Sequence, residues 1–285
     1  MYDIFKTVCL LSLLGGSATV LLLALKPITE KRFSAKWQYY IWFAALFCML
    51  IPMWKFIPKE RVKSFTERSS EVRQDINNTN DVTPKFPQQV PMDEKTVTDE
   101  INVQFTNERH IKLYGLLAVM WLCGAAVFFL WAVTSYIIFL VKMRRNSVDL
   151  QDNEAFENEK IELGIQRKIR LRISKKVSSP LLVGVFFPTV YIPQTELSPE
   201  TERLVYRHEL THLIHGDLIY KWLGLIVNAI HWFNPFAYFL CSNISQACEV
   251  YCDMSVVEHL NADERELYMK TILDLAQKEG GKRHV

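Results

Sequence analysis

Three long stretches of this sequence carry no charged residue, and they constrain the fold more than any other feature. They cover Val8–Leu25, about Tyr39–Trp54, and Leu113–Val141. About 20 apolar residues in an α-helix span the ~30 Å hydrocarbon core of a bilayer. The first stretch is long enough, the third is more than long enough, and the second is slightly short. Any one of them could be a buried helix of a soluble protein, but three in one chain favour transmembrane helices.

The basic residues beside these stretches predict the orientation of the chain in a membrane. They gather between the first two stretches and directly after the third: Lys26, Lys31, Arg32, Lys36, Lys142, Arg144 and Arg145. Lys and Arg near the ends of a span favour the cytoplasmic side. Those after the first stretch also favour a retained anchor over a cleaved signal peptide. We predict a multi-pass membrane protein with its N-terminus outside.

This orientation divides the chain into four expected parts. They are two transmembrane helices with a short cytoplasmic link (residues 1–57), a flexible extracellular loop (58–110), a third transmembrane helix (111–141) and a cytoplasmic, membrane-associated domain (142–285). The loop is rich in Asn, Gln, Thr and Pro and has too few apolar residues to build a core of its own.

The overall charge and the cysteines exclude other classes of protein. The chain has 33 Lys and Arg residues against 31 Asp and Glu residues, so its net charge predicts no direct nucleic-acid partner. Of the 6 cysteines, three fall in predicted spans and none in the outer loop, which predicts no disulfide framework.

From about Met143 the composition becomes that of a soluble domain. The alternating sequence KIRLRIS predicts a strand. The sequence SSPLLVGVFFPTVYIP, residues 178–193, predicts two short strands joined at FFP, and its prolines place it at a sheet edge. Ser198 is a plausible N-cap with Pro199 at the first helical position. The fold class is therefore mainly α, with a small edge β-hairpin or sheet in an α+β soluble domain.

The next predicted helix carries the sequence HELTH, which is typical of a zinc site. Four residues separate His208 from His212, so both imidazoles lie on one face and can bind one ion. Glu209 lies about 100° round the helix, where it can hold a water molecule and take its proton. The alternative is a core helix that contains histidines without a metal.

A catalytic zinc ion needs a third protein ligand and an open position. Glu249 and Asp253 share a helical face, so Glu249 could be the ligand while Asp253 orients a histidine. Asp217 is nearer in sequence but is expected to cap a helix. Cys248 and Cys252 have helical spacing too, but a thiolate site would leave Glu209 without a role. We therefore expect two buried cysteines.

An apolar segment, Leu218–Cys241, separates the two halves of this predicted site. A single membrane crossing would hold them ~30 Å or more apart, on opposite faces of the bilayer. The pair Asn234-Pro235 interrupts the segment, because proline disfavours helical geometry in the residue before it. We expect two helices, at about 199–233 (either continuous or broken near Gly216) and 236–255, folded back on each other, with their apolar faces against the membrane lipid or the spans.

Three further residues have weaker assignments. His231 and Tyr251 are candidates for contacting the substrate or donating to an oxyanion, although helix packing is at least as good an explanation for His231. His215 has no matching role and is expected at a surface or interface.

Four motifs occur in order along the soluble part: SPLLVGVFFPTVYIP, HELTHLIHGD, HWFNPFAYF and EVYCD. With the three spans and the polar loop, they make the chain resemble the membrane zinc metallopeptidases of the BlaR/MecR type, the antirepressors of beta-lactam resistance. The resemblance implies a zincin-like, gluzincin metallopeptidase domain in a bacterial-type cell membrane. It also implies that His208, His212 and Glu249 bind one zinc ion and that Glu209 is the catalytic base.

The resemblance further implies a biological role in signal transduction. An external signal such as a beta-lactam would lead to cleavage of a cytoplasmic protein, either a transcriptional repressor or the protease itself. Sensor members carry a further span and an extracellular penicillin-binding domain, but this sequence has no Ser-x-x-Lys acylation motif. We therefore expect either a shortened form of a sensor protein or a family member without the sensor domain, which takes its signal from a separate partner or through self-association.

Two other functions compete with a peptidase. A non-catalytic membrane signalling scaffold with a structural zinc site would tolerate loss of Glu209 but not of the histidines. A small transporter is less favoured, because no predicted span carries an ionisable residue.

Overall fold

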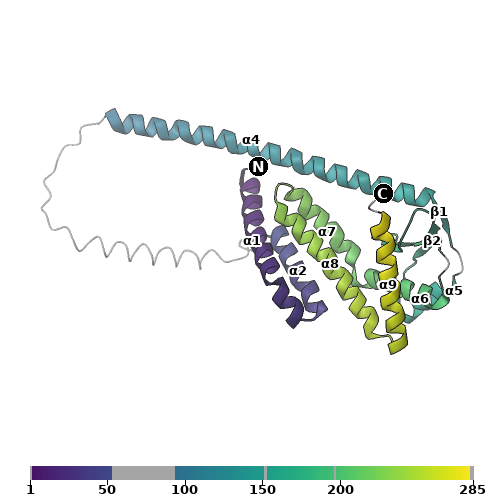
Figure 1. The fold of residues 1–285 in the computed structure, drawn as a ribbon. Coiled ribbons are helices and arrows are strands. Elements are labelled where there is room, and N and C mark those ends of the chain that lie inside the picture. The colour runs from purple at the N-terminus through teal and green to yellow at the C-terminus, as the bar shows by residue number, and fades with distance from the viewer. Residues whose placement is uncertain (1, 53–93, 151–152, 196, 283–285) are drawn as a thin grey trace.

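The computed structural model describes residues 2–52, 94–150, 153–195 and 197–282. The helices are α1 (Tyr2–Arg32), α2 (Ala35–Leu50), α4 (Glu94–Arg145), α5 (Glu154–Glu162), α6 (Pro199–His215), α7 (Asp217–Ile230), α8 (Pro235–Glu258) and α9 (Ala262–Lys282). The strands are β1 (Ser147–Asp149), β2 (Arg170–Ser174), β3 (Leu181–Val183) and β4 (Thr189–Pro193). Figure 1 shows α1, α2, α7 and α8 gathered at one side of the molecule and the sheet at the other, with α4 extending past both. The expectation of a mainly helical protein is confirmed.

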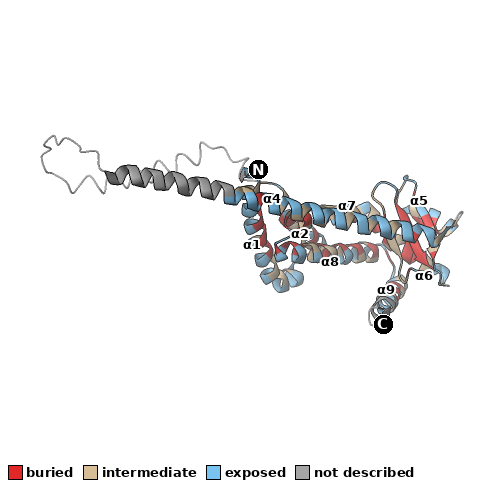
Figure 2. Ribbon diagram, turned by 90° about the horizontal axis from the view of Figure 1, so that it is seen from above, coloured by how far each residue is buried: buried red, intermediate tan, exposed pale blue. Residues whose placement is uncertain are grey.

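The first and third apolar stretches lie in α1 and α4, and the second lies in α2 as far as Leu50. By length and composition α1 and α4 can cross a membrane, while α6 and α7, bent by 56°, qualify only if the pair is counted as one span. Helix α2 has 16 residues, which at ~1.5 Å each is short of a full crossing. The apolar part of α4 is largely exposed, as expected for a helix in contact with lipid (Figure 2).

The start of α4 differs from the sequence expectation. The helix begins at Glu94, so residues 94–110, which were expected in the outer loop, continue the third apolar stretch as helix. Polar residues of this kind are compatible with a helix once it has nucleated on the apolar segment that follows. Residues 58–93 of the expected loop lie outside the described residues.

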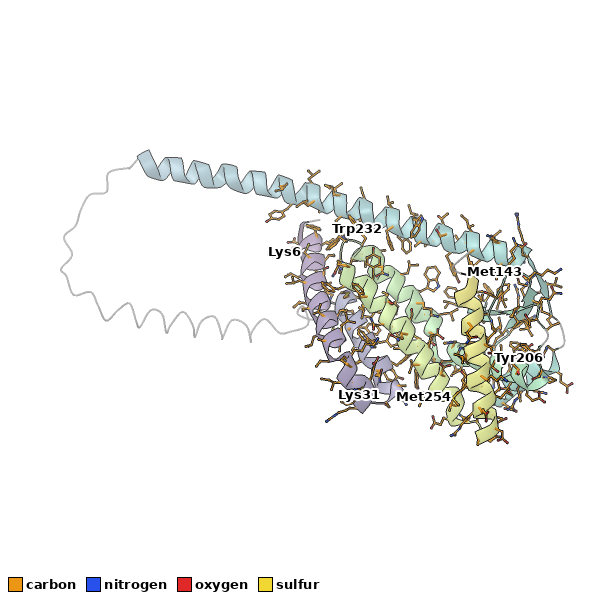
Figure 3. All side chains as sticks on the ribbon, viewed as in Figure 1. Lys6, Lys31, Met143, Tyr206, Trp232 and Met254 are labelled. Carbon is orange, nitrogen blue, oxygen red and sulfur yellow. The ribbon has the colours of Figure 1, made fainter. Side chains whose placement is uncertain are left out.

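The expected helix at 199–233 is divided at Gly216 into α6 and α7. Helices α7 and α8 fold back on each other, as the break at Asn234-Pro235 predicts. The side chain of Asn234 caps α8 by accepting a hydrogen bond from the Phe236 N–H, and its amide donates to the Ser12 hydroxyl of α1 at 2.8 Å. Further along, Lys26 of α1 donates to Asn243 of α8 at 2.8 Å. The hairpin therefore runs along α1, with Trp232 towards the Lys6 end of that helix and Met254 towards the Lys31 end (Figure 3).

A core of large side chains joins this hairpin to α2. Its buried members are Tyr39, Trp42, Phe43, Ala45, Leu46, Met49, Val227, Ala237, Leu240, Ile244, Ala247 and Cys248. The described part of this apolar stretch, in α2, thus packs mainly against α8 rather than facing outward along its whole length. This packing ties α2 to the segment that carries Glu249.

The sheet has the strand order β1-β2-β4-β3, with β2 and β4 parallel and the other pairs antiparallel. The expected hairpin is confirmed as β3 and β4, and β3 lies at the edge with Leu182 opposite Val190. One face of the sheet packs on α5 and α6 through Leu171, Val190 and Ile192. The other face carries Val183 and Tyr191 and packs near Met143 at the end of α4.

Candidate metal centre

Helix α6 presents two histidines side by side. The Ser198 hydroxyl accepts a hydrogen bond from the Thr201 N–H at the start of the helix, and Gly216 ends it in the left-handed region at φ 74°. Glycine suits this position because it has no Cβ to clash. Between these ends the helical spacing brings the Nε2 atoms of His208 and His212 to 3.2 Å from each other. Two ligand atoms on adjacent turns are thus available to one ion.

Helix α8 adds a carboxylate to the two imidazoles. Oε2 of Glu249 lies 3.3 Å from Nε2 of His212 and 3.9 Å from Nε2 of His208. A tetrahedral zinc ion with bonds of ~2.0–2.1 Å holds its ligand atoms about 3.3 Å apart. The three atoms therefore have the spacing of a metal-binding set, and the donor types are those that zinc prefers.

His212 is held by an aspartate from the next helix. Nδ1 of His212 lies 2.6 Å from Oδ2 of Asp217, whose side chain is fully buried. The other carboxylate oxygen of Asp217 accepts a hydrogen bond from the Tyr39 hydroxyl at 3.0 Å. A proton on Nδ1 leaves Nε2 with a lone pair for a metal. Asp217 does not cap α7, which begins without a side-chain cap.

His208 is held through a tyrosine. Nδ1 of His208 lies 2.7 Å from the Tyr268 hydroxyl, which donates to Oδ1 of Asp253 at 2.7 Å. Asp253 itself lies 3.4 Å from Nδ1 of His208. Because the tyrosine proton goes to Asp253, its oxygen can accept the Nδ1 proton, and Nε2 of His208 is again left free for a metal. Asp253 thus acts on His208 largely through Tyr268, which the sequence reasoning had missed.

Glu209, the predicted general base, lies in the same cavity as the candidate ligands. Its side chain is buried at 6 % exposure, and it lines the same cavity as His208, His212 and Glu249. Burial raises the pKa of Glu209 above its ordinary value, against the opposing charges of the two histidines. A carboxyl group with a raised pKa exchanges a proton more readily near neutral pH.

The electrostatics of the centre favour a cation. Burial acts to raise the pKa of Glu249, but the hydrogen bond and the charge of His212 outweigh it and lower the pKa to about 2. For His208 burial acts to lower the pKa, but hydrogen bonds to Asp253 and Cys252 outweigh it and raise the pKa to about 10. Carboxylates around the imidazoles thus make positive charge favourable between them.

A second donor set includes a cysteine. His208, His212 and Cys252 also lie close enough to hold an ion. The thiol of Cys252 is fully buried and approaches Nδ1 of His208 at 3.7 Å, on the nitrogen that Tyr268 already contacts. Cys252 is not among the residues that line the cavity, whereas Glu249 is. The Glu249 set is therefore the better fit, and the expectation that Cys248 and Cys252 are buried is confirmed.

A cavity of about 500 Å³ opens in front of the centre. Its walls come from α6, from the segment Ser179–Leu182 that includes the start of β3, and from Ile272 and Leu275 of α9. Lys221 of α7 reaches the cavity and lies 3.7 Å from Oε1 of Glu249. The cavity thus extends from the start of β3 to the two histidines.

Two of the weaker candidates lie elsewhere. His231 is at the turn between α7 and α8, with Nε2 at 3.1 Å from the Met49 carbonyl oxygen, and is fully buried. The ring of Tyr251 stacks on His215 with 4.3 Å between centroids. Neither His231 nor Tyr251 lines the cavity. Both side chains hold helices together, and the expected interface position of His215 fits this stacking.

The combination of fold and site defines a class of protein. Two histidines and a glutamate on one helix, a carboxylate from a second helix and an edge strand beside them are the parts of a metallopeptidase centre. Helices with the length and composition of spans belong to the same chain. The chain is thus a membrane protein with a metallopeptidase-like centre.

Comparison with known proteins agrees with this class. The family model "BlaR1 peptidase M56" matches residues 6–285, and the chain belongs to this family of metallopeptidases. The methicillin resistance mecR1 protein of Staphylococcus aureus is 23% identical over 251 residues, which are 83% of this chain and 40% of that protein. The regulatory protein BlaR1 of Bacillus licheniformis is 26% identical over 156 residues, 53% of this chain and 25% of that protein. The chain thus spans less than half the length of these relatives.

Proposed function

We propose that this chain is a zinc endopeptidase of a membrane signalling system and that it cuts a cytoplasmic protein. The observation that carries the proposal is the convergence of three ligand atoms, from His208, His212 and Glu249, within 3.9 Å of one another beside Glu209. The donor set fits one zinc ion, and the cavity leaves room for a peptide.

The chemistry divides between the ion and the chain. A zinc ion held by these ligands supplies a Lewis acid that polarises the scissile carbonyl group and acidifies a water molecule. Glu209 accepts the proton of the attacking water and returns it to the leaving amine. Asp217 and Tyr268 keep the imidazole protons on Nδ1, so that His212 and His208 stay oriented towards the ion.

The edge strand β3 is the proposed binding site for the substrate backbone. It pairs with β4 on one side only, and its residues Leu181 and Leu182 line the cavity in front of the histidines. An extended peptide can add to such an edge through main-chain hydrogen bonds. Ile272 and Leu275 of α9 then face the side chains of the added strand from the other wall.

The substrate class follows from the family and from the names of the relatives. Proteins named for methicillin resistance and for regulation share this family, so we propose a repressor-like protein, the chain itself, or both as substrates. The inducing signal would be external, such as a beta-lactam. It would reach the peptidase from a separate sensor or through self-association.

The proposed topology has three crossings. Helices α1, α2 and the apolar part of α4 would span the membrane, with the N-terminus outside and residues 142–285 in the cytoplasm. The basic residues Lys142, Arg144 and Arg145 at the end of α4 support this orientation. A reporter enzyme that works only in the cytoplasm should be active when it is fused after residue 145. An inactive fusion, with activity instead from a reporter that works only outside, would overturn the orientation.

The main alternative is a signalling scaffold with a structural zinc site. Its supporting observation is the buried Cys252 beside the two histidines, because thiolate ligation is typical of closed structural sites. A scaffold would not need Glu209 in the cavity, whereas a peptidase does.

One experiment separates the two functions. Wild type, Glu209→Ala and Glu200→Ala are purified in detergent, and bound zinc is measured together with cleavage of a co-expressed repressor-like protein and of the chain itself. Glu200 is an exposed residue of the same helix and serves as the matched control. We expect all three to hold zinc and only Glu209→Ala to lose cleavage, by about 10²–10⁴-fold. Equal behaviour of wild type and Glu209→Ala would favour the scaffold.

A further inference from the structure

A larger cavity lies on the sheet face that turns away from α6. Its volume is about 800 Å³, and it contains no residue of the metal centre. Its walls come from the last turns of α4, from the β3–β4 hairpin and from α7. They include Tyr136, Leu140 and Arg144, then Phe186 and Phe187, and Trp222. Nothing in the proposed proteolysis uses this space.

The cavity lies where a membrane span would leave the hydrocarbon. The apolar stretch of α4 ends at Val141, and Lys142, Arg144 and Arg145 follow in its last turn. A span of this composition places its terminal basic residues among the lipid headgroups. Tyr136 and Leu140 therefore lie at the level of the acyl chains, and Arg144 lies at the level of the phosphates.

One half of the cavity is apolar and open. Phe186 and Phe187 at the tip of the hairpin are 83% and 78% exposed, although they are large aromatic residues. Ile219 of α7, which also lines the cavity, is 52% exposed. On the opposite wall the rings of Tyr136 and Trp222 meet edge to face with 5.1 Å between centroids. Exposed apolar groups grouped beside a membrane helix indicate contact with lipid.

The other half of the cavity carries positive charge without a counter-charge. Arg144 and Arg170 line it, and neither side chain forms an ion pair or a hydrogen bond with any residue that the structure describes. By contrast, Arg172 is paired with Asp149 at 3.0 Å, and Arg167 donates to the Val185 carbonyl oxygen at 2.6 Å. Among the described residues, no Asp or Glu lines the cavity. Two free guanidinium groups are suited to a phosphate, which they can bind with paired N–H donors.

The geometry points to a binding site for one anionic phospholipid of the surrounding bilayer. Its phosphate would lie between Arg144 and Arg170, and its acyl chains would run along Leu140, Trp222 and the two phenylalanines. The lipid would hold the β3–β4 hairpin against the end of α4. It would thereby fix the edge strand in relation to the membrane, whatever protein or peptide occupies the other face.

The charge pattern favours a lipid over a protein partner. A protein surface that matched the aromatic tip would also need acidic groups at the depth of α4's last turn, inside the headgroup layer. An anionic phospholipid brings its phosphate to that level and its chains to the apolar wall below it. A second copy of the chain is the competing occupant, and the experiment below separates it.

The test uses the full chain in a mild detergent and counts bound lipids by native mass spectrometry. Phosphatidylglycerol and phosphatidylcholine with identical acyl chains are titrated separately. We expect one phosphatidylglycerol adduct to half-saturate at about tenfold lower concentration than the phosphatidylcholine adduct, which corresponds to one favourable charged contact. Equal half-saturation of the two lipids would overturn the proposal.

Three variants locate the site. The double variant Arg144→Gln and Arg170→Gln should bring phosphatidylglycerol to the level of phosphatidylcholine. The matched control, Lys31→Gln and Arg32→Gln at the exposed end of α1, should keep the preference. The double variant Phe186→Ser and Phe187→Ser should weaken the retention of both lipids. If the variant without the two arginines still prefers phosphatidylglycerol, the site is refuted. The site is also refuted if the phenylalanine variant keeps its lipid and instead loses a dimer that the wild type forms.

Discussion

Tyr39 of α2 and Asp217 at the start of α7 are joined by a hydrogen bond of 3.0 Å, although 178 residues separate them in the sequence. The Tyr39 hydroxyl also lies 3.1 Å from the His215 carbonyl oxygen, where α6 ends. Asp217 in turn holds Nδ1 of His212 at 2.6 Å. Helix α2, a proposed membrane helix, is thus connected to the proposed metal ligand His212 through one carboxylate. A shift of α2 would change how His212 is held.

Replacement of Tyr39 by phenylalanine should weaken the centre without unfolding the chain. The change removes only the hydroxyl, and the ring keeps its place in the core. Outer partners of metal ligands typically contribute 10–100-fold to affinity or activity. We expect an effect towards the lower end, about tenfold, because Tyr39 acts through Asp217. Zinc affinity is measured by competition with a chelator.

Tyr40→Phe is the control for this variant, because Tyr40 is the exposed neighbour on the same helix. It should leave zinc affinity unchanged. If Tyr39→Phe also binds zinc as tightly as wild type, α2 has no influence on the centre through this contact.

The local parts of the site could be predicted from the sequence, and the long-range parts could not. His208, Glu209 and His212 follow from helical spacing alone. Asp217 was read as a cap because an acid next to a helix-ending glycine is common there, yet its carboxylate turns towards His212. Tyr39 and Tyr268 carry no local signal, since their roles depend on the packing of distant helices.

The same distinction applies to the fold. The Asn234-Pro235 break predicted the helical hairpin, and the alternation of KIRLRIS predicted β2. The start of α4 at Glu94 was not predicted, because the polar residues before the apolar stretch have no hydrophobic period. A segment that is helical only because it continues its neighbour has no pattern of its own that predicts the helix.

The identity of the third ligand can be tested by paired substitutions in α8. Glu249→Gln should lower zinc affinity by at least about tenfold, because the neutral amide replaces an anionic ligand. Cys252→Ala should keep zinc, at a cost of about 1 kcal/mol in unfolding free energy from the lost buried thiol. Zinc content and X-ray absorption of the bound zinc are the measurements. A sulfur ligand in the absorption spectrum, or zinc loss in Cys252→Ala, would support the cysteine set instead.

The acid side of the pH profile should report Glu209. The ionised carboxylate is the active base, and burial raises its pKa, so activity should fall on acidification at a higher pH than for an exposed glutamate, whose pKa is ~4.3. The charge of Lys221 acts in the opposite direction and lowers the pKa of Glu209. Lys221→Met should therefore move the acid limb of kcat/KM to higher pH.

Lys175→Met is the matched control for the pH profile, because Lys175 is exposed in the turn after β2. It should leave the acid limb where wild type has it. A shift to lower pH in Lys221→Met, or equal shifts in the two variants, would show that the limb does not report Glu209 beside Lys221.

The role of β3 as the substrate edge can be tested with proline, which removes a backbone N–H and disfavours pairing. Val183→Pro changes β3 directly after Leu182, which lines the cavity in front of the histidines, and Val148→Pro changes β1 at the opposite edge of the same sheet. Both variants disturb one edge strand, but Val183 is buried and Val148 is 74% exposed, so Val183→Pro should lose more unfolding free energy and cleavage is compared at a temperature where both are folded. Only Val183→Pro should lower kcat/KM, by about tenfold or more, because main-chain pairing with the substrate depends on β3. Thermal unfolding and zinc content show whether each variant is folded. Equal cleavage by the two folded variants would mean that the substrate is held elsewhere, and the cavity between β3 and α9 would then need another occupant.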